Sequence, residues 1–244
     1  MVLEPDGLPQ VPLLAAPWQL HGSGYVLVVR LPEQLTDQAA FVPASLVGKR
    51  RGRTAYVMYM DYESSDCGPY RELMVLPASF DFEPGTYPSI TRIYVSSYDS
   101  VVNGRRNWGI PKDYADFEAQ RDGRDDRLSV SRGGHVFAEL HLRPYGLRLP
   151  VHSSLLPAGM RTLKQHWHNK VYGITLQAKG TLRLAKLLDW RFDAKFFPDL
   201  AQGRVVAAAY LPSFDMTFPV PSVRELPTTQ ARSTRTSSAG SLTM

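Results

Sequence analysis

The sequence predicts an α+β fold of mostly antiparallel β-structure, built as a barrel or a sandwich with a few short helices. Runs of β-branched and aromatic residues recur about every 8–15 residues, a spacing typical of all-β domains. Helical periodicity is confined to three short segments, and no Gly-x-Gly-x-x-Gly follows a strand-like run, which argues against a parallel, dinucleotide-binding sheet. The 244 residues fit one large domain, because all-β and barrel domains often reach this size.

The first half of the chain alternates strand-like runs with turns. The last of these runs alternates apolar and polar residues with a period of two, which indicates a half-buried strand. The expected strands are residues 25–30, 54–62, 72–80 and 89–97.

The second half repeats this pattern and contains two expected hairpins. Gly133-Gly134 is a hairpin signal between two strand-like runs, and Lys179-Gly180 marks a second hairpin after a Pro-rich stretch at 144–157. The expected strands are residues 114–121, 127–131, 136–142, 171–178, 181–188, 205–210 and 214–218.

Helices are expected at residues 32–40, where Pro32 suits the first turn, and at residues 99–107 and 194–200. Residues 1–17 are rich in Pro and Leu and are expected to form an extended N-terminal arm, followed by a domain over residues 18–224. The tail, residues 225–244, is almost entirely small or polar. It cannot bury enough apolar surface to offset its chain entropy, so we expect it to be disordered.

The composition of the chain argues against several classes of protein. The single cysteine, Cys67, rules out an intramolecular disulfide and a Cys-based zinc cluster. The sequence shows no secretory signal and no apolar run of the roughly 18 residues that a membrane span needs, so we expect a soluble, cytoplasmic protein with no membrane partner. The net charge of +5 is scattered apart from one cluster at 49–53, which lacks interleaved aromatic residues. A nucleic-acid partner is therefore not expected.

The segment 98–118 stands out because it combines glycines, Trp108 and a proline around two arginines and one lysine. Gly104 and Gly109 permit positive φ angles, and Pro111 restricts the backbone directly before Lys112. A lysine held rigidly beside aromatic and apolar side chains loses hydration. Desolvation favours the neutral amine, whose lone pair can attack a carbonyl carbon. From these residues alone, the alternative that Lys112 is a turn lysine with its ammonium in water stays open.

The run Asn103-Gly-Arg-Arg-Asn-Trp-Gly-Ile-Pro-Lys112 resembles the signature of the acetoacetate decarboxylase family, in which Gly-Arg-Glu is followed by Pro-Lys. Upstream, Gly68-Pro-Tyr-Arg-Glu72 resembles the family's second motif, Tyr-x-Glu about forty residues before the lysine. The resemblance covers roughly residues 16–224. It implies a cone-shaped β-barrel with a few short helices.

The resemblance also implies roles for individual residues. Lys112 matches the family's Schiff-base lysine, and Glu72 matches its active-site glutamate, a candidate for proton transfer or substrate orientation. Tyr70 is expected to line the same pocket and bind substrate. Trp108 is expected to bind substrate as well, as part of the aromatic and apolar wall that the sequence predicts beside Lys112. Arg105 matches the signature arginine, which either binds substrate or pins the loop.

The chain departs from the family pattern at several positions. Asp113 stands where the decarboxylase has a second lysine, and Arg106 replaces the signature glutamate. Val57 stands where the decarboxylase has a further glutamate, and Gly22 or Gly24 lies near the place of its N-terminal arginine. These changes argue against acetoacetate itself as the substrate.

The resulting hypothesis is a cofactor-free Schiff-base lyase acting on a small keto acid through Lys112. The alternatives are an aldolase-dehydratase with the same lysine and a non-catalytic small-molecule binding protein of the same fold. The resemblance further implies a homo-oligomer. His166 and His168 share one face if extended, but no third ligand lies in an obvious position, so no metal is expected.

Overall fold

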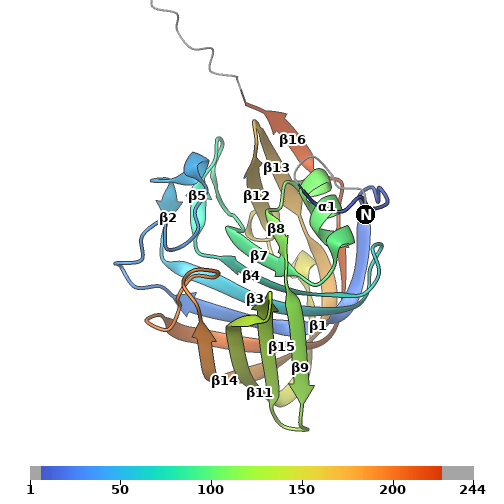
Figure 1. Ribbon diagram of the computed structural model, residues 1–244, viewed down its shortest axis with the longest axis vertical. Helices are drawn as coiled ribbons and strands as arrows, with labels where there is room; N and C mark the ends of the chain where they lie inside the picture. The colour runs from blue at the N-terminus through green and yellow to red at the C-terminus, as the bar shows by residue number, and fades with distance from the viewer. Residues whose placement is uncertain (1–6, 227–244) are drawn as a thin grey trace, which may run out of the picture.

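The computed structural model describes residues 7–226; of the predicted tail, only residues 225 and 226 fall among them. Ten strands form one curved sheet in the order β8-β7-β4-β3-β1-β15-β14-β11-β10-β9 (Figure 1). Its two edge strands, β8 (Lys112–Tyr114) and β9 (Asp116–Arg121), are consecutive in the sequence and are separated only by the buried Ala115. The chain itself therefore joins the two edges of the barrel at Ala115, three residues after Lys112.

Neighbouring strands of the large sheet are antiparallel, except that β7 and β8 run parallel. The remaining strands of this sheet are β1 (Trp18–Arg30), β3 (Thr54–Ser64), β4 (Tyr70–Leu76), β7 (Arg92–Val95), β10 (Asp126–Arg132), β11 (His135–His152), β14 (Gln177–Phe192) and β15 (Arg204–Phe218).

Two three-stranded sheets and one α-helix accompany the barrel. The helix α1 (Tyr98–Trp108) lies near the small sheet β12-β13-β16, at the end of the molecule opposite the tip of β9 (Figure 1). Three 3-10 turns cover 44–46, 153–155 and 158–160. The small sheets are β2 (Arg50–Arg51), β5 (Ser79–Asp81) and β6 (Thr86–Pro88), and β12 (Thr162–Trp167), β13 (Lys170–Thr175) and β16 (Ser222–Glu225).

The two faces of the curved sheet supply two separate hydrophobic cores. Alternate residues of β3 show this division, because Val57 and Tyr59 belong to the first core, whereas Met60 and Tyr62 belong to the second. The first core fills the barrel. The second lies where α1 and the sheet β12-β13-β16 cover β3, β4 and β7, and this layer also contains Lys112.

The predicted fold class is confirmed, but two of the three predicted helices are wrong. Residues 32–40 form turns, because their backbone hydrogen bonds do not continue into a helical ladder and Phe41 follows with a left-handed φ of 54°. Residues 194–200 form a turn that begins at Asp193 and stops before Pro198. The helix predicted at 99–107 is present as α1 and is one residue longer at each end.

Several strand predictions are also wrong. Residues 205–210 and 214–218 form one continuous strand, β15, rather than two, and the expected strand 72–80 is broken between β4 and β5. The hairpin expected at Lys179-Gly180 is absent, because β14 runs straight through it. Gly180 instead allows close approach to β15, since a Cβ there would lie 2.4 Å from the carbonyl oxygen of Ser213. Strand β11 continues into the Pro-rich stretch, where a register irregularity between Tyr145 and Leu149 accommodates the backbone. Within the described residues, no helix is both long and apolar enough to cross a membrane.

Candidate active site

A helix, a glycine turn and a short strand position Lys112. Ser97 caps α1 by accepting a hydrogen bond from the backbone N–H of Ser100, and Gly109 ends the helix with a left-handed φ of 62°. Pro111 follows, and Lys112 opens β8, which pairs with β7 in parallel. Since the turn is so short, the Lys112 side chain returns against the helix that precedes it.

The amine of Lys112 lies inside the second core and has three polar neighbours. Its Nζ lies 2.9 Å from Oε2 of Glu72, 3.0 Å from Oγ of Ser100 and 3.5 Å from the hydroxyl of Tyr70. The Nζ also lies 5.0 Å from the centre of the Tyr70 ring, within cation–π range. The Lys112 side chain is only 6% exposed. This burial excludes the alternative in which Lys112 lies in a surface turn with its ammonium in water.

Glu72 lies on β4 opposite Met60, and its side chain is 3% exposed. Its second oxygen, Oε1, accepts a hydrogen bond of 3.3 Å from the hydroxyl of Tyr62 on the neighbouring strand β3. Both carboxylate oxygens are therefore engaged, one by a cation and one by a phenol. Because a buried charge is stable only when it is paired and hydrogen-bonded, this arrangement allows a carboxylate to exist here.

Gly104 makes room for the lysine stem. A Cβ at this position would lie 2.7 Å from Cδ of Lys112 and 3.0 Å from Cε. The first distance is shorter than real contacts of a Cβ and the second is at their lower limit, so a larger residue at position 104 would require the lysine stem to shift.

Asp113 points away from the amine, as alternation along a strand requires. Its carboxylate forms ion pairs of 2.9 Å with Arg92 and with Arg105. Arg105 also donates from Nε to the backbone carbonyl of Lys112 at 2.9 Å. Asp113 therefore does not pair with Lys112, and Arg105 fixes the main chain of the lysine rather than its amine.

Trp108 is buried within the second core. Its indole N–H donates to the carbonyl of Pro219 at 2.7 Å, and its ring packs edge-to-face against Trp18 and Phe218. The structure thus gathers Lys112, Glu72 and Tyr70 but places neither Trp108 nor Arg105 among the hydrogen-bond partners of the amine. Substrate-binding roles for these two residues stay predictions.

Sequence reasoning missed two hydroxyls of this site, those of Ser100 and Tyr62. Alternation along β3 places Tyr62 on the same face as Met60, and both are in the second core. Val57, which stands at the family's further glutamate, lies in the first core on the other face of β3. The signal for Ser100 is its place on α1 four residues before Gly104, one helical turn away on the same face.

Burial shapes the protonation of the aromatic hydroxyls. Desolvation, strengthened by the nearby charge of Glu72, raises the pKa of both Tyr62 and Tyr70 well above 10. Desolvation also raises the pKa of the Cys67 thiol, although its hydrogen bond with Ser65 opposes this effect. At neutral pH the two phenols therefore carry their protons and can donate them.

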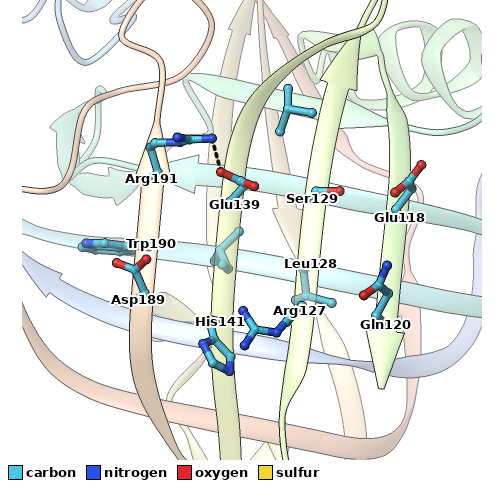
Figure 2. Close-up of a pocket in the computed structure, with 12 residues that line it drawn as sticks. Glu118, Gln120, Arg127, Leu128, Ser129, Glu139, His141, Asp189, Trp190 and Arg191 are labelled. Carbon is cyan, nitrogen blue, oxygen red and sulfur yellow. Dashed lines mark ion pairs between the residues drawn. The ribbon is translucent and has the colours of Figure 1, made fainter. Parts of the chain in front are cut away.

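An open groove of about 430 Å³, separate from the surroundings of Lys112, lies on the outer wall of the barrel (Figure 2). Polar side chains from four adjacent strands, β9, β10, β11 and β14, line it. One row across the strands runs Glu118, Ser129, Glu139 and Arg191, and the next runs Gln120, Arg127, His141 and Asp189. Glu139 and Arg191 form an ion pair across this surface. The groove is exposed and of mixed charge, so it provides none of the desolvation found around Lys112.

The geometry agrees with a family assignment. A family model for acetoacetate decarboxylase (ADC) matches residues 23–192, which is most of the chain. The chain belongs to the acetoacetate decarboxylase family. No curated protein matches its sequence.

Several solved structures share the fold. The enduracididine biosynthesis enzyme MppR complexed with pyruvate is 14% identical, with a TM-score of 0.62 over 90% of this chain and 94% of that one. An acetoacetate decarboxylase from Legionella pneumophila subsp. pneumophila str. Philadelphia 1 is 12% identical, with a TM-score of 0.63 over 89% and 92%. An acetoacetate decarboxylase-like enzyme from Sphingomonas wittichii RW1 is 14% identical, with a TM-score of 0.62 over 88% and 95%. At these identities the likeness establishes the fold.

Proposed function

We propose that this protein is a cofactor-free Schiff-base lyase that acts on a small keto acid through Lys112. The observation that carries the proposal is the buried pair of Lys112 and Glu72, with 2.9 Å between Nζ and Oε2 and side chains only 6% and 3% exposed. A buried pair of this kind can pass one proton from ammonium to carboxylate and become a neutral amine beside a carboxylic acid. The transfer is direct, because no other group lies between Nζ and Oε2 at this distance.

The neutral amine then attacks the keto carbon, and loss of water gives an iminium. The iminium draws electrons from the adjacent carbon–carbon bond, so the carboxylate of a β-keto acid leaves as carbon dioxide and an enamine remains. We assign to Glu72, whose Oε1 accepts a hydrogen bond from the Tyr62 hydroxyl, the transfer of a proton from water to the enamine carbon. Water then releases the product from Lys112.

An aldolase-dehydratase is the second candidate. One solved structure of the same fold is MppR with the condensation product of pyruvate and imidazole 4-carboxaldehyde, a product in which two carbonyl compounds have joined. The same enamine on Lys112 could attack an aldehyde instead of taking up a proton. A third candidate, a non-catalytic binding protein, is less favoured, because it predicts an exposed ammonium paired with Asp113, whereas Asp113 pairs with Arg92 and Arg105.

Trapping with borohydride tests the proposal. The protein is incubated with a panel of keto acids, including pyruvate, borohydride is added, and the intact mass is measured before and after. We expect a stable adduct with at least one keto acid and none in the Lys112→Ala variant. A panel without any adduct, or an adduct that persists in Lys112→Ala, contradicts the proposal. Release of carbon dioxide then separates the lyase from the aldolase-dehydratase, which instead consumes an added aldehyde.

We also propose that the chain assembles as a homo-oligomer. Large apolar side chains on neighbouring strands are exposed, including Leu147 and Leu149 on β11 and Leu184 on β14, which are 83%, 56% and 52% exposed. Gathered apolar surface of this kind often marks a protein interface. Light scattering coupled to size exclusion checks this, and a mass of 27.3 kDa for the particle contradicts it.

A further inference from the structure

Ser100 occupies a position that the two family motifs do not cover. It lies in the first turn of α1, is fully buried, and its Oγ lies 3.0 Å from Nζ of Lys112. Its hydroxyl also hydrogen-bonds to Tyr70, an interaction that opposes the larger effect of burial on the pKa of that phenol. One hydroxyl thus bridges the reactive amine and a phenol that carries a proton.

A bridge of this kind facilitates the formation of a carbinolamine. When the lone pair of Nζ bonds to the carbonyl carbon, the nitrogen must lose a proton and the carbonyl oxygen must gain one. Direct transfer passes through a strained four-membered ring. A hydroxyl beside the nitrogen widens it to a six-membered ring, made of nitrogen, proton, hydroxyl oxygen, its proton, carbonyl oxygen and carbon.

We propose that Ser100 is a catalytic residue of Schiff-base formation, whose hydroxyl accepts the proton from Nζ of Lys112 and donates its own proton to the carbonyl oxygen of the substrate. The inference rests on the proposed function, since it assigns a role within that reaction. The hydrogen bond to Tyr70 holds the Ser100 hydroxyl in place between transfers. In atom balance, the N–C bond forms, the carbonyl π bond breaks, and Ser100 ends the step with a hydroxyl again.

The second step uses the proton that Glu72 took from the ammonium. Glu72 returns it to the carbinolamine hydroxyl, the C–O bond breaks, water leaves, and the nitrogen lone pair forms the iminium. The sum is one ammonium and one ketone giving one iminium and one water. Ser100 and Glu72 lie on different elements, α1 and β4, and both contact the same nitrogen. Each can therefore serve one of the two proton transfers.

The experiment measures the rate at which pyruvate forms the adduct, by rapid mixing, quenching with borohydride and intact mass. The variants are Ser100→Ala and, as a matched control, Ser97→Ala, which removes the cap of the same helical turn but leaves the hydroxyl beside Nζ. We expect Ser100→Ala to slow adduct formation about 100-fold, the usual size of a general acid–base contribution. We expect Ser97→Ala to stay within about 2-fold of the wild type, because it removes no proton-transfer group.

A relay accelerates formation and hydrolysis alike, so Ser100→Ala should slow both by the same factor and leave the final extent of adduct unchanged. The wild type supplies a measurement that needs no variant. Two protons moving in one step predict that the rate follows a quadratic, downward-bowed function of the deuterium fraction of the solvent rather than a straight line. A linear dependence, or an unchanged rate in Ser100→Ala, overturns the role of Ser100. Absence of any adduct in the wild type overturns the proposed function as well, so the two failures are distinguishable.

Discussion

Two ion pairs of opposite character lie on the barrel wall, Lys112–Glu72 in the second core and Arg191–Glu139 in the open groove. The residue types are alike, but the exposed fractions of the side chains differ, at 6% and 3% for the first pair against 73% and 47% for the second. Water solvates the groove pair, so its charges are screened and cost little. In place of that water, the two charges of the core pair contact each other, three hydroxyls and an aromatic ring. The two pairs therefore differ mainly in their environment, and the proposed reactivity of Lys112 depends on that difference.

The largest difference between the two regions is expected in stability. We predict that Glu72→Ala lowers the free energy of unfolding by about 3–5 kcal/mol, because it leaves a buried ammonium without its oppositely charged partner. Glu139→Ala should change it by no more than about 0.5 kcal/mol, as surface substitutions usually do. Urea denaturation of both variants measures this. Equal losses in the two variants would show that burial does not distinguish the pairs.

The next largest effect is expected where the aliphatic stem of Lys112 packs against α1, and it concerns both stability and the rate of adduct formation. Gly104→Ala places a methyl group within 2.7 Å of Cδ of Lys112, so we predict a loss of about 1–3 kcal/mol from overpacking and a shift of the amine from Glu72. Gly159→Ala is the matched control, because a Cβ there meets no atom within 4 Å. Thermal unfolding and the rate of pyruvate adduct formation report the two consequences. A Gly104→Ala variant with unchanged stability and rate contradicts the tight fit.

Substitution of Asp113 tests whether the second lysine of the decarboxylase pattern would accelerate adduct formation in this chain. Asp113→Lys restores the residue of the decarboxylase pattern, but this side chain faces Arg92 and Arg105 rather than the amine. We predict a loss of about 1–3 kcal/mol from the lost charge-assisted bonds and no acceleration of adduct formation. Asp113→Asn, which introduces no positive charge, should lose less. Faster adduct formation in Asp113→Lys would show that the side chain does reach Lys112.

The smallest effect is a dependence of stability on alkaline pH. Burial and the charge of Glu72 raise the pKa of Tyr62 and Tyr70 well above 10, whereas both phenols ionise near pH 10 in the unfolded chain. The folded state therefore binds more protons above pH 10. The contribution of these phenols is fully present below pH 10 and is lost as the pH rises further. Unfolding at pH 8 and pH 11 measures the loss, and Tyr62→Phe should reduce it. A loss unchanged in Tyr62→Phe contradicts this assignment.

Much of the fold and the centre of the site could be predicted from the sequence. Alternating runs predicted most of the strands, and the signature around Lys112 and Glu72 predicted which two distant residues meet. The strand periodicity failed at Gly180, where a glycine serves close packing rather than a turn. Ser100 and Tyr62 were not predicted, because their roles depend on which face of α1 and of β3 turns toward the amine. That choice is made by the packing of α1 on β8, not by the local pattern.

The central claim is that burial, rather than residue type, makes Lys112 reactive, and mapping the trapped adduct tests it most directly. After incubation with pyruvate and borohydride, peptides are compared for modification at Lys112 and at Lys179, whose side chain is 66% exposed. The account predicts modification of Lys112 in nearly every molecule and at most traces at Lys179. Equal modification of the two lysines, or modification of Lys179 alone, would contradict it.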